Sequence, residues 1–97
     1  MHARITSGSI RPEKIEETVN TFRDKLIPRA KTQEGFKDIF FLIDSKTNKF
    51  HIISLWDSEE NMLAGESTMF LFKQLSSIVP HFAAKPITER FQVAIKA

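Results

Sequence analysis

The stretch FKDIFFLIDSKTNKFHIISLW, residues 36–56, decides the fold of this chain. Its two ends, residues 36–44 and 49–56, are rich in β-branched and aromatic residues, which favour strands. The polar residues 45–48 between them have the composition of a hairpin loop. The stretch therefore predicts an antiparallel β-hairpin, in which we expect Asp44 to pair with Lys49.

Both faces of this hairpin are apolar. A strand that is buried on one face only would alternate apolar and polar residues. A register shifted by one residue would exchange the two faces but leave both of them apolar. With the register above, one face carries Ile39, Phe41, Ile43, Phe50, Ile52 and Trp56, and the other carries Phe40, Leu42, Ile53 and Leu55 together with His51.

The doubly apolar hairpin implies a partner. Helices can cover one face, but the other face would expose a larger apolar patch than soluble monomers normally tolerate. A second copy packed sheet to sheet about a two-fold axis covers this patch most simply, and a different protein or a lipid is the alternative. We therefore expect a homodimer whose interface comprises Phe40, Leu42, His51, Ile53 and Leu55.

Strand and helix patterns precede and follow the hairpin. Residues 3–10 predict a first strand, and residues 87–95 alternate as a half-buried strand does. From Pro12 onward an apolar stripe recurs at helical spacing, and Pro28 predicts a kink or a separate last turn. The stripe comprises Ile15, Val19, Phe22, Leu26 and Ala30.

Two more helical stretches lie between the hairpin and the last strand. Ser58 is a candidate N-cap for a short helix that Gly65 interrupts, and a second stretch begins near Ser67. The order βαββαβ predicts a ferredoxin-like α+β fold, a four-stranded antiparallel sheet with both helices on one face. The second stretch places Leu71, Leu75, Ile78 and Phe82 on one face.

Length and composition limit the classes of protein to which the chain can belong. The 97 residues predict one domain over residues 1–97, and a net charge of +2 does not favour nucleic acid as a partner. The chain has no cysteine, and its longest purely apolar run, residues 39–43, is far too short to span a bilayer. Since the start of the sequence also lacks a signal-peptide pattern, we expect a cytoplasmic protein without a membrane segment.

Several segments resemble a known family. These are the helix start at residues 11–14, the passage from Pro28 to Phe36, and above all the LWDSEE motif at residues 55–60. Over nearly its whole length the chain resembles the antibiotic-biosynthesis-monooxygenase-like domains of the dimeric α+β barrel superfamily. The resemblance implies a homodimer whose sheets pack into a barrel, with a ligand pocket between helices and sheet in each subunit. Members include cofactor-free oxygenases of aromatic polyketides or quinols, and haem-degrading enzymes.

The chain departs from the family at positions that carry its chemistry. Two histidines that many members have would fall near Gly65 and Phe70. The haem-ligating histidine of the haem-degrading branch would fall at Gln74 or Leu75, and the polyketide oxygenases use tyrosines, of which this chain has none. We therefore expect no cofactor and weak or no catalysis.

The remaining candidate residues are few. No two histidines have the helical spacing of metal ligands, so we expect no metal site. The catalytic residues stay unknown, with His51 and Glu66 as weak candidates for a general base. Arg90 could orient an anionic or quinone-like ligand, or form a surface ion pair. A ligand pocket, or alternatively plain core packing, would use Phe22, Phe41, Trp56, Phe70, Phe72 and Arg90.

Two functions follow from these patterns, and whether the protein is an enzyme stays open. The first is a homodimeric α+β barrel protein that binds a small apolar or aromatic ligand with weak or no catalysis. The second is a cofactor-independent oxygenase that ionises a hydroxylated aromatic or quinol substrate in a desolvated pocket. The second function needs a general base, which the first does not.

Overall fold

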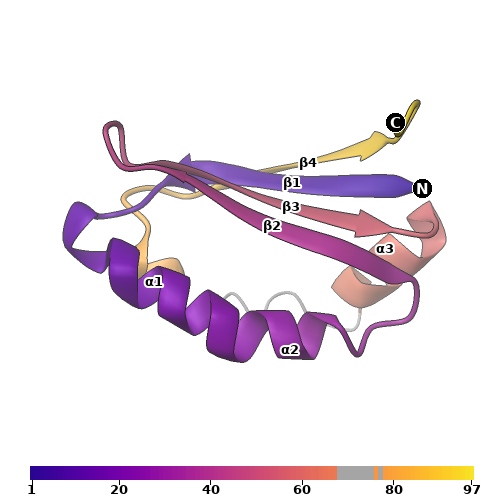
Figure 1. The fold of residues 1–97 in the computed structure, drawn as a ribbon, viewed down its shortest axis with the longest axis horizontal. Helices are drawn as coiled ribbons and strands as arrows, with labels where there is room; N and C mark the ends of the chain where they lie inside the picture. Colours follow the sequence, from indigo (N-terminus) through magenta and orange to yellow (C-terminus); the bar gives the residue numbers. More distant parts are fainter. Residues whose placement is uncertain (68–75, 77) are drawn as a thin grey trace.

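A computed structural model describes residues 1–67, 76 and 78–97. Four strands, β1 (His2–Ser9), β2 (Phe36–Asp44), β3 (Lys49–Trp56) and β4 (Ile87–Gln92), form one antiparallel sheet in the order β2-β3-β1-β4. The helices α1, α2 and α3 all lie on the same side of this sheet (Figure 1). The predicted ferredoxin-like α+β fold is confirmed.

The hairpin forms as the sequence predicts. Asp44 pairs with Lys49, and the backbone N–H of Asn48 donates to the carbonyl oxygen of Asp44 at 2.7 Å. Asn48 has a φ of 61°, a left-handed conformation that asparagine tolerates better than most residues. This register places Phe41, Phe50 and Ile52 toward the helices and Phe40 away from them. Both faces of the hairpin are therefore apolar, as expected.

The first and the last strand along the chain, β1 and β4, differ slightly from their predicted bounds. The first strand begins at His2 and ends at Ser9, one residue before the predicted end. The last strand ends at Gln92 instead of continuing to Ile95, because Gln92 pairs with His2 and β1 offers no further residue to pair with. One more hydrogen bond, from the N–H of Val93 to the carbonyl oxygen of Met1, closes the ladder.

A single helical segment follows β1. One of its turns, shortly before Pro28, is wider than a regular α-helical turn. It comprises the 3-10 turn η1 (Pro12–Lys14), α1 (Ile15–Thr21), the π-helical turn η2 (Phe22–Leu26) and α2 (Ile27–Ala30). Proline has no N–H, and its ring would clash with the carbonyl four residues earlier in a regular α-helix. A π-turn directly before Pro28 gives the ring room. The sequence predicts a kink or a separate last turn at Pro28; in the structure the last turn, α2, follows η2 without a break, and the irregularity is the π-turn.

The buried face of this helical segment differs from the predicted stripe at one position. Phe22, Leu26 and Ala30 are buried as expected, but Val19 is 37% exposed and its neighbour Thr18 is fully buried. Thr18 can be buried because its hydroxyl is satisfied: it donates to the carbonyl oxygen of Lys14 and accepts from Nδ1 of His81, both at 2.7 Å.

An aromatic core holds the helical segment to the sheet. The rings of Phe50 and Phe82 stack with centroids 4.7 Å apart, and those of Phe22 and Phe41 meet edge to face at 4.8 Å. The end of the second predicted helical stretch is corrected: Ile78 and Phe82 are buried, but a 3-10 turn, η3 (Val79–His81), lies between them and Phe82 is extended and pairs with Ile10. Leu71 and Leu75 lie outside the described residues. The cluster comprises Ile10, Phe22, Leu26, Phe50, Ile52, Ile78 and Phe82.

The helix α3 (Glu59–Ser67) corrects one expectation. Ser58 caps its start, since its hydroxyl accepts from the N–H of Asn61 at 3.1 Å. Gly65 does not interrupt it, because α3 continues to Ser67. A glycine costs a helix interior about 1 kcal/mol relative to alanine, which packing can offset. Gly65 lies against Trp56, where an added Cβ would be 3.7 Å from ring atom Cη2.

Gly35 is required where the chain turns into β2. Its φ is +78°, and an added Cβ would lie 2.2 Å from Nδ2 of Asn61. We expect Gly35→Ala to lower the free energy of unfolding by roughly 2 kcal/mol, because the side chain adds left-handed strain and a clash with α3. Urea unfolding followed by circular dichroism measures this change. An unchanged midpoint would contradict the close approach of Gly35 to Asn61.

Candidate functional site: the groove between α3 and β4

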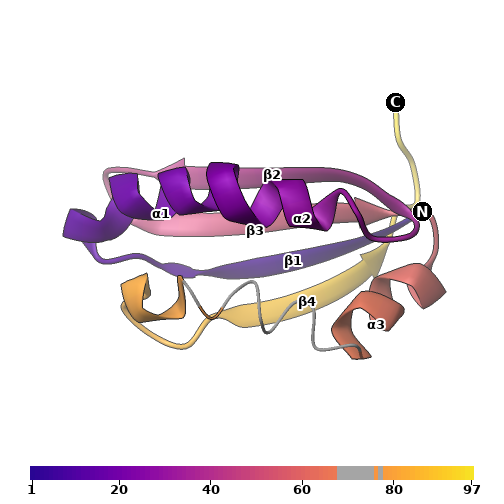
Figure 2. The same ribbon diagram turned by 90° about the horizontal axis from the view of Figure 1, so that it is seen from below.

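The functional site that the structure suggests lies where α3 meets the ends of β1 and β4 (Figure 2). Arg4, on β1, points to the helix side of the sheet and is buried. Its guanidinium carbon lies 5.4 Å from the ring centroid of Trp56, within the range of a cation–π contact. Its Nη1 donates to the carbonyl oxygen of Met62 at 3.4 Å, which ties α3 to the sheet.

A carboxylate of α3 joins two arginines. Oε2 of Glu66 lies 3.4 Å from Nη1 of Arg4 and accepts from Nε of Arg90 at 3.1 Å, while Oε1 accepts from Nη2 of Arg90. The register aligns Arg4 on β1 with Arg90 on β4, so both guanidinium groups reach the same side chain. With two cations and one anion, the cluster of Arg4, Glu66 and Arg90 has one positive charge in excess.

The cluster fixes the charge state of its members. Burial by itself would raise the pKa of Glu66, but the hydrogen bond from Arg90 and the charge of Arg4 outweigh it and hold that pKa below its ordinary value. The hydrogen bond to Glu66 raises the pKa of Arg90. A carboxyl group that is held ionised in this way is a poor proton acceptor, because its lowered pKa lowers its basicity.

A groove of about 370 Å³ lies between α3 and β4 beside this cluster. Leu63 supplies exposed apolar surface beside the almost fully buried Met62, and Arg90 supplies a cation. Phe91 borders the groove from β4, where its side chain points to the opposite face of the sheet. At the other end of the groove, Nε2 of His2 lies 3.1 Å from Oε2 of Glu59. Nδ1 of His2 is buried and has no hydrogen-bond partner among the described residues. The full lining is His2, Glu59, Met62, Leu63, Arg90, Phe91 and Gln92.

The residues predicted to line a pocket lie in different places. Phe22 and Phe41 contact each other on the helix side of the sheet, and Phe22 belongs to the core. Trp56 packs against Arg4 and meets Phe36 edge to face at 5.6 Å. Arg90 lines the groove. Phe70 and Phe72 lie outside the described residues, so that the pocket itself stays a prediction.

Sequence reasoning missed most of the groove. Gln92 shares a face with Arg90, since residues two apart on a strand point the same way, and this spacing was the available signal. Nothing in the sequence placed His2 or Leu63 there. Their positions depend on how α3 lies over the sheet, which periodicity alone does not define.

The two candidate bases lie on opposite faces of the sheet. Glu66 is on the helix side, held by the arginines. His51 lies on the other face, where its Nδ1 is 2.7 Å from the hydroxyl oxygen of Ser7 on the neighbouring strand. The structure therefore does not bring the two together. His81 is buried against Thr18, with its Nε2 3.8 Å from Oε1 of Glu17.

The face of the sheet that points away from the helices carries large exposed apolar side chains. We call it the outer face. The register aligns Phe40, Ile53 and Ile5 across three strands. Phe40 is 49% exposed and Ile87, at the edge of the sheet, is 66% exposed. The outer face comprises Ala3, Ile5, Ser7, Asp38, Phe40, Leu42, His51, Ile53, Leu55, Ile87, Glu89 and Phe91. It contains all five residues of the predicted dimer interface.

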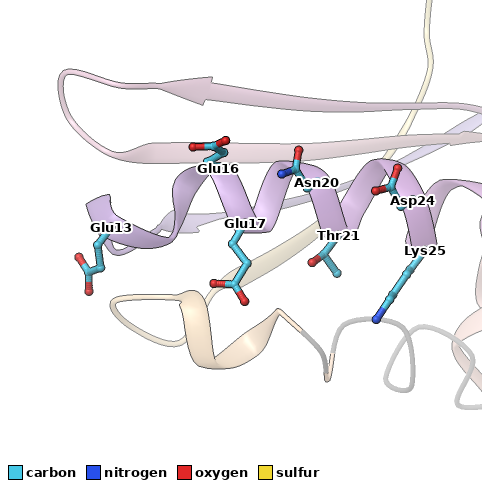
Figure 3. Close-up of a pocket in the computed structure, with 7 residues that line it drawn as sticks. All are labelled: Glu13, Glu16, Glu17, Asn20, Thr21, Asp24 and Lys25. Atoms are coloured by element: carbon cyan, nitrogen blue, oxygen red, sulfur yellow. The ribbon is translucent and has the colours of Figure 1, made fainter.

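A second hollow, of about 390 Å³, follows the outer side of the helical segment that begins at Pro12. Figure 3 shows its side chains projecting from a single helical segment, and four of them are carboxylates. Within the described part of the chain, no group of three or more His, Cys, Asp or Glu side chains is placed to hold a metal ion. The lining residues are Glu13, Glu16, Glu17, Asn20, Thr21, Asp24 and Lys25.

Comparison with solved structures defines the class of fold. The chain is similar to provisionally named antibiotic biosynthesis monooxygenases from Bordetella bronchiseptica (TM-score 0.82, 12% identity, 97% of each chain covered) and Deinococcus radiodurans (0.81, 11% identity, 100% of this chain and 96% of that chain). It is also similar to a Nitrosomonas europaea protein of unknown function (0.77, 12% identity, 99% of this chain and 91% of that chain). No protein-family model and no curated protein matches the sequence.

The chain therefore has the fold of the antibiotic-biosynthesis-monooxygenase-like proteins, and the resemblance that the sequence indicates is confirmed at the level of the fold. Identities this low identify a fold and leave the activity open, since one fold carries many functions. Among the described residues, no helix is long and apolar enough to cross a membrane.

Proposed function

We propose that the protein is a homodimer in which each copy binds a small apolar or aromatic ligand, with weak or no catalysis. The observation that best supports ligand binding is the groove between α3 and β4. A volume of about 370 Å³ lies within the range of small-molecule sites, about 300–1,000 Å³. Leu63, with Met62 buried beside it, makes the α3 side of the groove apolar, which favours an apolar body on the ligand.

The outer face supports the homodimer. Phe40 and Leu42 on one edge strand, and Ile87 and Phe91 on the other, are exposed on the side of the sheet that no described helix covers. Ile5, Ile53 and Leu55 lie on the two strands between them. A self-complementary patch of this kind is buried most simply by a copy of itself about a two-fold axis. Packing the two outer faces together would form a two-sheet sandwich whose interior resembles a protein core.

The charge state of the candidate base supports weak or no catalysis. A cofactor-independent oxygenase needs a group that accepts a proton from its substrate, within hydrogen-bond reach. Near the groove, Glu66 is held ionised by Arg4 and Arg90 with a lowered pKa. His51 lies on the outer face, across the sheet from the groove. The groove therefore favours binding over proton abstraction.

Dye binding and oxygen uptake test this function together. We expect the amphiphilic dye 1-anilinonaphthalene-8-sulfonate, which presents aromatic rings and a sulfonate, to quench the fluorescence of Trp56, the only tryptophan, through energy transfer. Leu63→Ser should weaken binding by about tenfold, because it removes apolar surface from the groove. Val79→Ser is the matched control, since Val79 is similarly exposed but does not line the groove.

Oxygen uptake with a panel of hydroquinones and anthrones is expected to be weak or absent. Robust turnover that disappears in Glu66→Gln or His51→Gln, with the assembly unchanged, would contradict the proposal. It would make the protein a cofactor-independent oxygenase and identify its base. Unaltered dye binding in Leu63→Ser would place the ligand outside the groove.

A further inference from the structure

The guanidinium of Arg90 has an edge that the described residues leave unused. Glu66 binds it side-on, through Nε and Nη2. An arginine has five N–H donors, so three remain, and two of them, one on Nη1 and one on Nη2, lie side by side along the end of the group. The side chain of Arg90 is 44% exposed and lines the groove.

A free guanidinium edge of this shape matches one chemical group in particular. Two parallel N–H donors fit the two oxygens of a carboxylate, and such a bidentate pair is stronger than a neutral hydrogen bond. The cluster also has one positive charge in excess, because Glu66 offsets only one of its two arginines. The nearest other carboxylate of the groove, Glu59, is already 3.1 Å from Nε2 of His2.

We propose that the groove between α3 and β4 selects a monoanionic aromatic or alicyclic carboxylate. Its carboxylate binds the Nη1 and Nη2 edge of Arg90, and its ring lies against Leu63. Glu66 acts as a positioning residue that holds the guanidinium plane and keeps its charge. This inference rests on the proposed ligand-binding function and adds the charge of the ligand to it.

The rigidity of the site supports selection by charge. Arg4 is buried under α3 and fixes Glu66 from below, while Glu66 fixes Arg90 through two hydrogen bonds. A preorganised arginine loses less side-chain freedom when a ligand binds than a free surface arginine does. The opposite end of the groove holds Gln92 and the pair of His2 and Glu59, and the Glu59 carboxylate would repel a second anionic group. One carboxylate per ligand, at the Arg90 end, is therefore what the site can bind.

A pair of isosteric probes tests the charge. We use 2-naphthoate and its neutral analogue 2-naphthamide, and follow the backbone resonances of the full-length protein during titration. We expect 2-naphthoate to bind about tenfold more tightly than 2-naphthamide, since hydrogen bonds to charged groups are the stronger class. The resonances of Leu63 and Phe91 should shift with both probes. In Arg90→Gln the affinity for 2-naphthoate should fall to that for 2-naphthamide.

Two variants make the outcome specific to Arg90. Arg23→Gln is the matched control, because Arg23 also binds a carboxylate side-on, that of Asp24, but lies away from the groove. It should leave both affinities unchanged. Arg90→Lys keeps the positive charge but loses the two parallel N–H donors. Part of the tenfold preference for 2-naphthoate over 2-naphthamide should therefore disappear.

The possible failures are distinguishable. Equal affinity for the two probes would overturn the anion selectivity, and a preference for 2-naphthoate that persists in Arg90→Gln would overturn the role of Arg90. Either result would leave the ligand-binding function intact. Binding of neither probe at millimolar concentration would overturn the groove as a ligand site, and with it both proposals.

Discussion

Phe40→Glu is expected to raise the dissociation constant of the proposed dimer by at least about 100-fold and to leave a folded monomer in solution. Phe40 lies on the edge strand β2, next to Ile53 of β3, and is 49% exposed on the outer face. In the dimer its replacement would bury a carboxylate without a partner, which costs several kcal/mol. Sedimentation or light scattering at micromolar concentration measures the change in mass.

A control separates this effect from a general loss of stability. Val19 is an apolar residue of the helical segment and is exposed on the other side of the molecule. We expect Val19→Glu to remain a dimer, because Val19 lies outside the outer face. Circular dichroism of Phe40→Glu should match the wild-type spectrum. A wild-type protein that is a well-behaved monomer at the same concentration would refute the proposed assembly.

Glu66→Gln is expected to lower the free energy of unfolding at pH 7 by about 2 kcal/mol. The change leaves the buried guanidinium of Arg4 without its countercharge, and removing one partner of a buried pair is costly. Arg90 is partly exposed, so water compensates for part of the loss. Urea unfolding measures the effect. Asp24→Asn, in the exposed pair with Arg23, is the control and should change little.

The pH dependence of this difference is a sharper test. The pKa of Glu66 is lower in the folded than in the unfolded state, so its charge stabilises the fold above the unfolded pKa of about 4.3. That contribution is lost as the pH falls through the folded pKa. The wild-type protein and Glu66→Gln should therefore differ at pH 7 and converge in stability toward pH 3. A difference that stays constant with pH would mean that the Glu66 charge is not responsible.

Residues 36–56 contain enough information to predict most of the fold. Their strand composition, the polar loop and the register from Asp44 to Lys49 are local properties, and all of them are confirmed in the structure. The two apolar faces follow from the period of two in a strand, which tertiary packing does not change. The same local rules place the N-cap at Ser58 and an irregularity of the helical segment near Pro28.

Where the sequence-based predictions fail, packing outweighs local preference. Gly65 was expected to end a helix, but contact with Trp56 keeps it within α3. Val19 was expected to be buried, but Thr18 takes its place because Lys14 and His81 satisfy its hydroxyl. These outcomes depend on partners distant in the sequence, which helical spacing does not reveal.

The sequence by itself determined the order of the elements, the doubly apolar hairpin and the class of fold. Only the tertiary structure decided which chemistry those elements bring together. Arg4, Glu66 and Arg90 come from a strand, a helix and a second strand, and each alone looks like an ordinary surface charge. The antiparallel register of β1 and β4, and the place of α3 above them, turn these three residues into one cluster beside a groove. Charges interact through space, so only the folded arrangement of the chain defines their partners.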